Sequence, residues 1–167
     1  MYIPNNFILQ ELVWRKCYEV AKKANLQWAL WRKFDDRFLI TIDQFVKDFG
    51  TTIINNWYFG KLDWLGNQIF EYSGARPHIL PIGENWGSRT MHLDWNTGDL
   101  KVKKFSILSS SDKKQAYNNA RDYIIEHKKK YPYVTVLESG EYAPRWIHLS
   151  TGNFNHGDGS IRIVKPS

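Results

Sequence analysis

The sequence contains a single cysteine, Cys17, among 167 residues. One thiol excludes an internal disulfide, and it also excludes the zinc sites that are built from pairs of cysteines. Any bound metal must therefore be held by histidine and carboxylate side chains. The sequence also lacks the run of about 18 to 20 uncharged apolar residues that a membrane span needs. Its first residues lack the basic and then apolar layout of a signal peptide, so we expect no membrane span and a protein that stays in a cytoplasm.

Length and composition are those of one folded domain. A chain of this length usually folds around a single core, and its 43% hydrophobic and 24% charged residues exclude collagen-like, disordered and coiled-coil proteins. The net charge of +6 is compatible with a nucleic-acid partner, an anionic polymer or a well-solvated surface. The basic run at 128–130 ends a predicted helix, where positive charge complements the helix dipole. It requires no partner, and we expect no nucleic acid to bind.

Hydrophobic spacing predicts the secondary structure. Apolar residues at three- and four-residue steps predict one helix over 5–24 and another from Ser109 to about Lys129. An irregular connection with a short helix follows the first, and then Thr41 begins a helix with a capping box that Gly50 ends. Alternating or β-branched residues predict strands at 51–56, 100–107, 133–138, 145–150 and 161–164. A long loop with repeated glycine and proline covers 57–91.

This order of elements predicts the fold class. Helices come first, and strands with one inserted helix follow, which favours a single α+β domain with a central, largely antiparallel sheet flanked by helices. The eight Trp, nine Tyr and nine Phe residues exceed what a core of this size requires. Some of them are therefore expected to line a surface or groove.

Three of the five histidines are weak candidates for a functional site. His127 lies on the buried stripe of a basic helix, where a packed or solvated role suffices. His78 lies in the long loop and is more typical of an ordinary loop residue than of a ligand. His156 lies in a turn-forming segment near the C-terminus and is a reserve metal ligand.

The other two histidines fit the spacing of a zinc site. Strand alternation puts His148 on the same face as Trp146, so it can form a cleft wall. His92 precedes Asp99 by seven residues, and the turn between them can place Asp99 beside it. Two histidines and one aspartate are a common ligand set for catalytic zinc, with the fourth position left for water. Such a site needs a base, and Glu138, ten residues before His148, can supply it.

These segments resemble, in order along the chain, the zinc D-Ala-D-Ala carboxypeptidases and L-Ala-D-Glu endopeptidases, especially their small phage-encoded members. The similarity extends from Phe49 to Val164. Residues 90–99 correspond to the family motif Ser-x-His-x-x-Gly-x-Ala-x-Asp and keep its histidine and aspartate. Glu138 and the segment 146–148 match the family's base and final ligand. Residues 72–77, Tyr-Ser-Gly-Ala-Arg-Pro, match a Ser-Gly-x-Arg segment whose arginine faces the substrate.

The resemblance implies roles for five residues. His92, Asp99 and His148 would bind one Zn²⁺, Glu138 would act as the general base, and Arg76 would bind a substrate carboxylate. An ion pair that braces the long loop is an equal alternative for Arg76.

The resemblance also implies a fold and a biological setting. Residues 49–167 would form an α+β core like that of the hedgehog and DD-peptidase proteins, and residues 1–48 would form a helical segment that packs on it or extends it. Asp94 shares a strand face with His92 and is an alternative to Asp99 as a ligand. The implied activity is zinc-dependent hydrolysis of peptidoglycan stem peptides during phage lysis or entry. The protein would be located in the host cytoplasm before lysis or in the virion, with other virion proteins as further partners.

Four positions depart from the family pattern. Thr90 replaces serine, Trp95 replaces glycine, Thr97 replaces alanine, and Ser150 stands where phage relatives usually have aspartate. A tryptophan in place of glycine implies a changed loop path or a partly filled cleft. These departures leave an alternative open, namely a non-catalytic virion structural or wall-binding protein that retains the peptidase fold.

Overall fold

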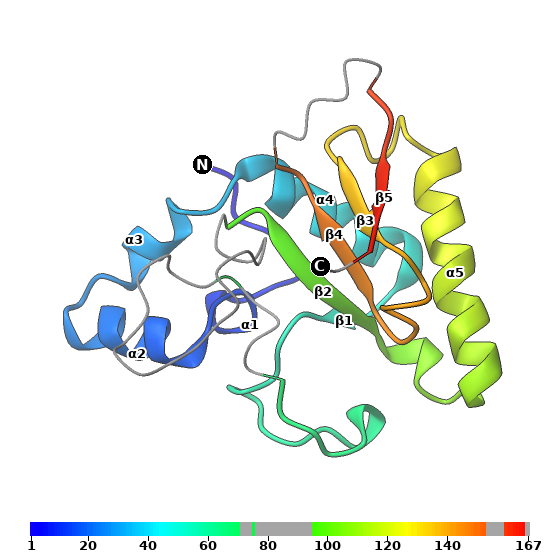
Figure 1. Cartoon of the computed structure of the whole chain (residues 1–167). Helices are drawn as coiled ribbons and strands as arrows, with labels where there is room; N and C mark the ends of the chain where they lie inside the picture. The colour runs from blue at the N-terminus through cyan, green and yellow to red at the C-terminus, as the bar shows by residue number, and fades with distance from the viewer. Residues whose placement is uncertain (71–74, 76–94, 153–158, 166–167) are drawn as a thin grey trace.

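A mixed sheet is the centre of the fold (Figure 1). The computed structural model describes residues 1–70, 75, 95–152 and 159–165. Within these ranges the five strands follow the order β1-β2-β4-β3-β5. Their bounds are β1 (Thr52–Ile53), β2 (Thr97–Val102), β3 (Val136–Glu138), β4 (Ile147–Ser150) and β5 (Arg162–Val164). Only β3 and β5 are parallel, and the other three pairings are antiparallel. The predicted single α+β domain with a largely antiparallel sheet is confirmed.

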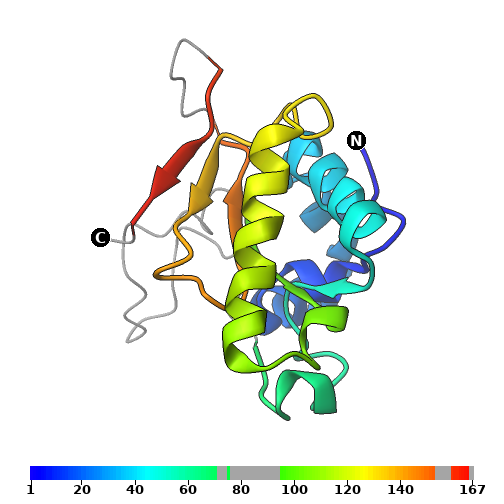
Figure 2. The same cartoon turned by 90° about the vertical axis from the view of Figure 1, so that its right-hand side faces the viewer.

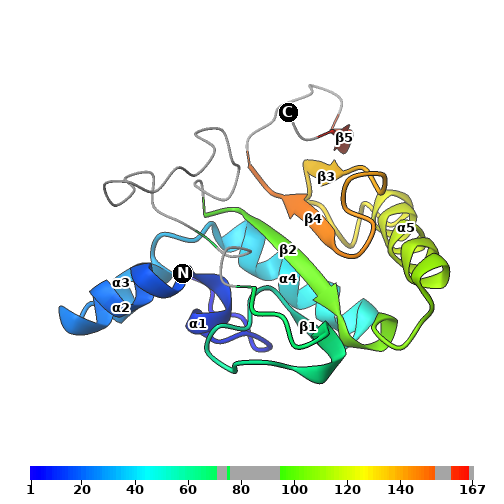
Figure 3. The same cartoon turned by 60° about the horizontal axis from the view of Figure 1, so that its bottom comes forward.

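The two longest helices lie on one side of this sheet (Figure 2). The helices are α1 (Leu9–Leu12), α2 (Arg15–Lys23), α3 (Gln27–Trp31), α4 (Asp36–Phe49) and α5 (Ser110–Glu126), with short 3-10 helices η1 (Asp63–Leu65) and η3 (Lys103–Phe105). Figure 2 shows α4 and α5 against the same face of the sheet. The short helices α2 and α3 pack on each other and project to one side (Figure 3). Among the described residues, no helix covers the opposite face.

Strand alternation divides the residues of β2 and β4 between these two faces. Leu100, Ile147 and Leu149 are completely buried in the hydrophobic cluster that they share with α4 and α5. The intervening residues Asp99 and His148 therefore point to the face that no described helix covers. The core thus fixes the strands, and the opposite face is left for polar side chains.

The predicted helix over 5–24 is wrong in one respect, because the chain forms two helices there. Val13 is extended and forms a bridge with Ala75. The carbonyl of Val13 also accepts hydrogen bonds from Asn55 and Trp57, at 3.0 and 2.9 Å. These long-range contacts outweigh the local helical preference.

The helix predicted from Thr41 begins earlier than expected. Asp35 is its N-cap, because the Asp35 carboxylate accepts a hydrogen bond from the backbone N–H of Arg37. Thr41 lies inside α4, where its hydroxyl donates to the carbonyl of Arg37. The predicted end is confirmed, since Gly50 follows the helix with a φ of 83°.

The other predicted helices and strands agree with the structure to within a few residues, and most of the predicted loop over 57–91 lies outside the described residues. Ser109 caps α5 as expected, with its hydroxyl accepting from the N–H of Asp112. The strand predicted at 100–107 begins earlier and gives way to η3. Within the ranges that the structure describes, no helix has the length and apolar character needed to cross a membrane.

Candidate active site

Asp99 and His148 form the centre of the site on the open face of the sheet. They are directly opposite each other in the antiparallel pairing of β2 with β4. Their side chains share a hydrogen bond, with Nδ1 of His148 2.6 Å from Oδ1 of Asp99. The predicted convergence of these two residues, 49 positions apart, is thus present in the structure.

Glu138 lies beside this pair on the neighbouring strand β3. Its Oε2 is 3.9 Å from Nδ1 of His148, and only 12% of its side-chain surface is exposed. Burial raises the pKa of Glu138 above its ordinary value, and the Asp99 carboxylate adds to this effect. The nearby His148 and Arg121 act in the opposite direction. A partly buried carboxyl group next to an imidazole is suited to accept and return a proton.

Arg121 of α5 fixes the backbone around Glu138 and His148. The residue is buried, with 5% of its surface exposed. Nε donates to the carbonyl of Glu138 at 2.9 Å, and Nη2 donates to the carbonyl of Trp146 at 2.7 Å and to that of Ala143. One side chain therefore connects the end of β3 to the residues just before β4.

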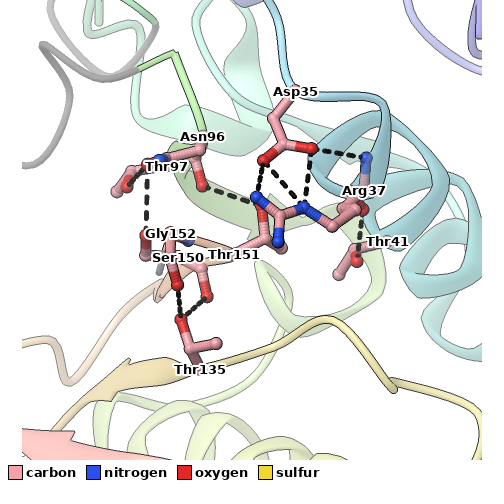
Figure 4. A network of polar contacts seen from close by, with 9 residues as sticks. All are labelled: Asp35, Arg37, Thr41, Asn96, Thr97, Thr135, Ser150, Thr151 and Gly152. Carbon is pink, nitrogen blue, oxygen red and sulfur yellow. Dashed lines mark hydrogen bonds and ion pairs between the residues drawn. The ribbon is translucent and has the colours of Figure 1, made fainter. Parts of the chain in front are cut away.

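A second network holds the far ends of the same strands together (Figure 4). The Ser150 hydroxyl donates to the side chain of Asn96, and the Asn96 carbonyl accepts from Thr151. Thr135 donates through its hydroxyl to the carbonyls of Ser150 and Gly152, at 3.2 and 2.8 Å. Ser150 is completely buried. The Ser150 hydroxyl thus joins β4 to the residue just before β2.

Trp95 adopts a backbone conformation that usually favours glycine. Its φ is 57°, in the left-handed region that costs a residue with a side chain about 1 to 2 kcal/mol. Trp95 is 9% exposed and belongs to the hydrophobic core, and its indole packs edge-on against Phe34, with ring centroids 5.1 Å apart. The packing against Phe34 offsets the backbone strain at this position.

Lys101 lies next to the site on β2, two residues after Asp99. It is 5% exposed, and its ammonium group donates to the carbonyls of Ile54 and Asp99, at 3.0 and 3.3 Å. Burial lowers the pKa of Lys101 to about 8, and the Asp99 charge partly opposes this shift. A buried cation is thus placed beside the carboxylate of the candidate site.

Several predicted site residues lie outside the described residues. These are the proposed ligand His92, its neighbour Asp94, the substrate-binding Arg76, and the weaker candidates His78 and His156. Trp146, which strand alternation was expected to put on the same face as His148, is half-buried.

The described residues supply two of the three predicted zinc ligands. Within the described ranges, no group of three or more His, Cys, Asp or Glu side chains is arranged to hold a metal ion. The imidazole of His148 and the carboxylate of Asp99 are ligand types that zinc accepts. A hydrogen bond joins the two groups through Nδ1 of His148, and the imidazole would have to be neutral to hold a metal ion. The donor chemistry therefore fits zinc, with the third ligand to come from outside this pair.

Sequence reasoning missed the roles of Arg121 and Lys101. Arg121 is one turn from Tyr117 and Ile124 on the buried face of α5. A charged residue inside an apolar stripe indicates a buried polar partner, and this signal was available. Lys101 alternates with Leu100 and Val102 like any exposed strand residue, so the sequence gives no sign of its burial.

Comparisons with protein-family models, with curated proteins and with solved structures find no significant match to this chain.

Proposed function

We propose that this protein is a zinc-dependent hydrolase of peptidoglycan stem peptides. The observation that supports the proposal best is the meeting of Asp99 and His148 across β2 and β4, with Glu138 beside them on β3. The sequence places the same three residues in the roles of two ligands and a base. His92 would be the third ligand.

Each residue of the site would contribute a separate function. Bound zinc supplies Lewis-acid chemistry, which lowers the pKa of water toward about 7 and polarises a peptide carbonyl. Glu138 accepts a proton from the attacking water, whose oxygen forms a bond to the carbonyl carbon. Glu138 then gives that proton to the nitrogen of the leaving amine as the C–N bond breaks. Burial raises the pKa of Glu138, which makes its carboxylate a stronger base toward the attacking water.

Two further features support an anionic cell-wall substrate. The chain carries a net charge of +6, which attracts an anionic polymer. Arg76 would bind a carboxylate of the stem peptide through its planar guanidinium group. The phage setting, in lysis or entry, follows from the family resemblance alone.

The test is cleavage of a synthetic stem peptide by zinc-loaded protein, measured by release of the new amine. Glu138→Gln removes the base and keeps the size of the side chain, so we expect the rate to fall by a factor of about 10² to 10⁴. Glu141→Gln is the matched control, because Glu141 is 69% exposed and lies three residues along the same chain segment. Full activity in Glu138→Gln would contradict the proposed mechanism.

The alternative is a non-catalytic protein that binds the cell wall or other virion proteins. Exposed aromatic side chains favour it, because Trp28, Tyr58 and Phe59 are 55%, 54% and 47% exposed. The same assay separates the two functions. A wild-type protein that binds zinc and sedimented cell walls, yet releases no amine, would support the alternative.

A further inference from the structure

A pocket of about 650 Å³ opens next to the candidate site. It lies between the segment around η1, the strand β2, the start of α5 and the residues just before β4. Lys101 and Trp146 line the pocket. Lys101 is two residues after Asp99, and Trp146 is two residues before His148. Its volume is in the range of about 300 to 1,000 Å³ that small-molecule sites occupy.

Positive charge predominates in the lining of the pocket. Among the described residues that form it, three are basic, Lys101, Lys113 and Arg145, and one is acidic, Asp63. Charges in a concave site with low-dielectric walls act more strongly than on an open surface. The pocket therefore attracts an anion.

The rest of the lining includes several aromatic residues. Trp64, Phe70 and Trp146 contribute flat apolar surfaces to it. The ammonium group of Lys101 lies over the ring of Phe70, 4.6 Å from its centroid. Charge and apolar surface are thus in direct contact, which suits a ligand that carries an anionic group on an apolar body.

We propose that this pocket binds a monocarboxylate with an apolar or aromatic body. The basic side chains bind the carboxylate, and the aromatic walls cover the body. This binding requires neither zinc nor catalysis, so it does not depend on the proposed hydrolase activity.

The first turn of α5 favours a single negative charge over a phosphate dianion. Lys113 reaches the pocket from this turn, but the N–H of Asp112 is already bound to the Ser109 hydroxyl. The carboxylates of Asp112 in this turn and Asp63 in the pocket wall repel a second negative charge. A carboxylate is therefore the better fit.

Calorimetric titration with two matched probes tests the proposal. N-acetyltryptophan carries an indole and a carboxylate, and N-acetyltryptophan amide lacks only the charge. We expect the acid to bind at least tenfold more tightly than the amide and to shift the indole N–H resonance of Trp146. Phenyl phosphate is the third probe and is expected to bind more weakly than the acid.

Variants of the pocket locate the binding. The double variant Lys113→Gln and Arg145→Gln should weaken the acid about tenfold and leave the amide unchanged. Lys103→Gln is the control, because Lys103 is exposed and does not line the pocket. Lys101→Met, checked for folding by circular dichroism, should also lose the preference for the acid. Glu138→Gln should bind both probes like the wild type, which separates this inference from the proposed function.

Three results would overturn the proposal. They are equal affinity for acid and amide, no binding of either probe at millimolar concentration, and tighter binding of phenyl phosphate than of the acid.

Discussion

Replacement of Arg121 by methionine should both destabilise the fold and displace the candidate site. The methionine keeps an apolar stem of similar length inside α5 and removes the guanidinium group. The carbonyls of Glu138, Ala143 and Trp146 then lose their donor. These carbonyls belong to the segment that joins β3 to β4, which carries Glu138 and precedes His148.

The magnitude follows from these contacts. A buried acceptor that loses its partner costs about 1 to 3 kcal/mol. The total cost for the three carbonyls is less than three times this value. The methionine variant avoids the cost of burying the charged guanidinium group, and water can reach part of the segment. We therefore expect Arg121→Met to lower the free energy of unfolding by about 3 to 5 kcal/mol, as when one partner of a buried charged contact is removed.

Urea denaturation measures this loss of stability, and the rate of stem-peptide cleavage reports the displacement of Glu138. Arg121→Lys retains the charge but cannot reach three carbonyls, so its stability should fall between those of wild type and Arg121→Met. At a temperature where Arg121→Met is folded, its rate of stem-peptide cleavage should fall at least tenfold. A loss of stability below 1 kcal/mol would refute the structural role of Arg121. Unchanged cleavage by a stably folded variant would refute its role in positioning.

Two further predictions concern backbone strain and pH. Trp95→Ala should lower the free energy of unfolding by about 3 to 5 kcal/mol, because it removes a buried ring. Trp95→Gly should be about 1 kcal/mol more stable than the alanine variant, because φ is positive at this position. If urea denaturation shows the alanine variant to be the more stable of the two, backbone strain at Trp95 is excluded. Burial raises the pKa of Glu11 from 4.5 to about 7, so folded protein binds a proton that unfolded protein has released, and stability should fall as pH rises from 4.5 to 7. This pKa shift corresponds to about 3 kcal/mol of stability. Between pH 5 and pH 8, the free energy of unfolding of the wild type should fall by about 2 to 3 kcal/mol relative to that of Glu11→Gln, as measured by urea denaturation at each pH. If the two proteins show the same pH dependence, the burial of this carboxyl group is contradicted.

The sequence predicted those elements whose signals are local. The helix α5 combines apolar spacing with a capping serine, and both act within the helix itself. The break between α1 and α2 was not predictable in this way, because Val13 pairs with residues 55, 57 and 75. The start of α4 was misplaced, because the capping-box pattern at Thr41 lies inside the helix and Asp35 is the residue that caps it.

The candidate site shows the same distinction. Spacing and family resemblance predicted that Asp99, Glu138 and His148 would meet, and the strand register brings them together. The place of Arg121 in the apolar stripe of α5 signals a buried polar partner, but its partners are main-chain carbonyls, which the sequence does not identify. The roles of His92 and Arg76 stay predictions, because both residues lie outside the described ranges.

Measurement of zinc binding tests the central claim most directly. After equilibrium dialysis against zinc, metal analysis should find one zinc ion per wild-type chain and the same in Glu138→Gln. His148→Ala and Asp99→Asn should each bind zinc at least 100-fold more weakly, whereas His127→Ala, which changes a histidine stacked on Tyr123 in α5, should bind like the wild type. A wild-type chain without zinc, or a His148→Ala variant that binds it as tightly as the wild type, would contradict the account.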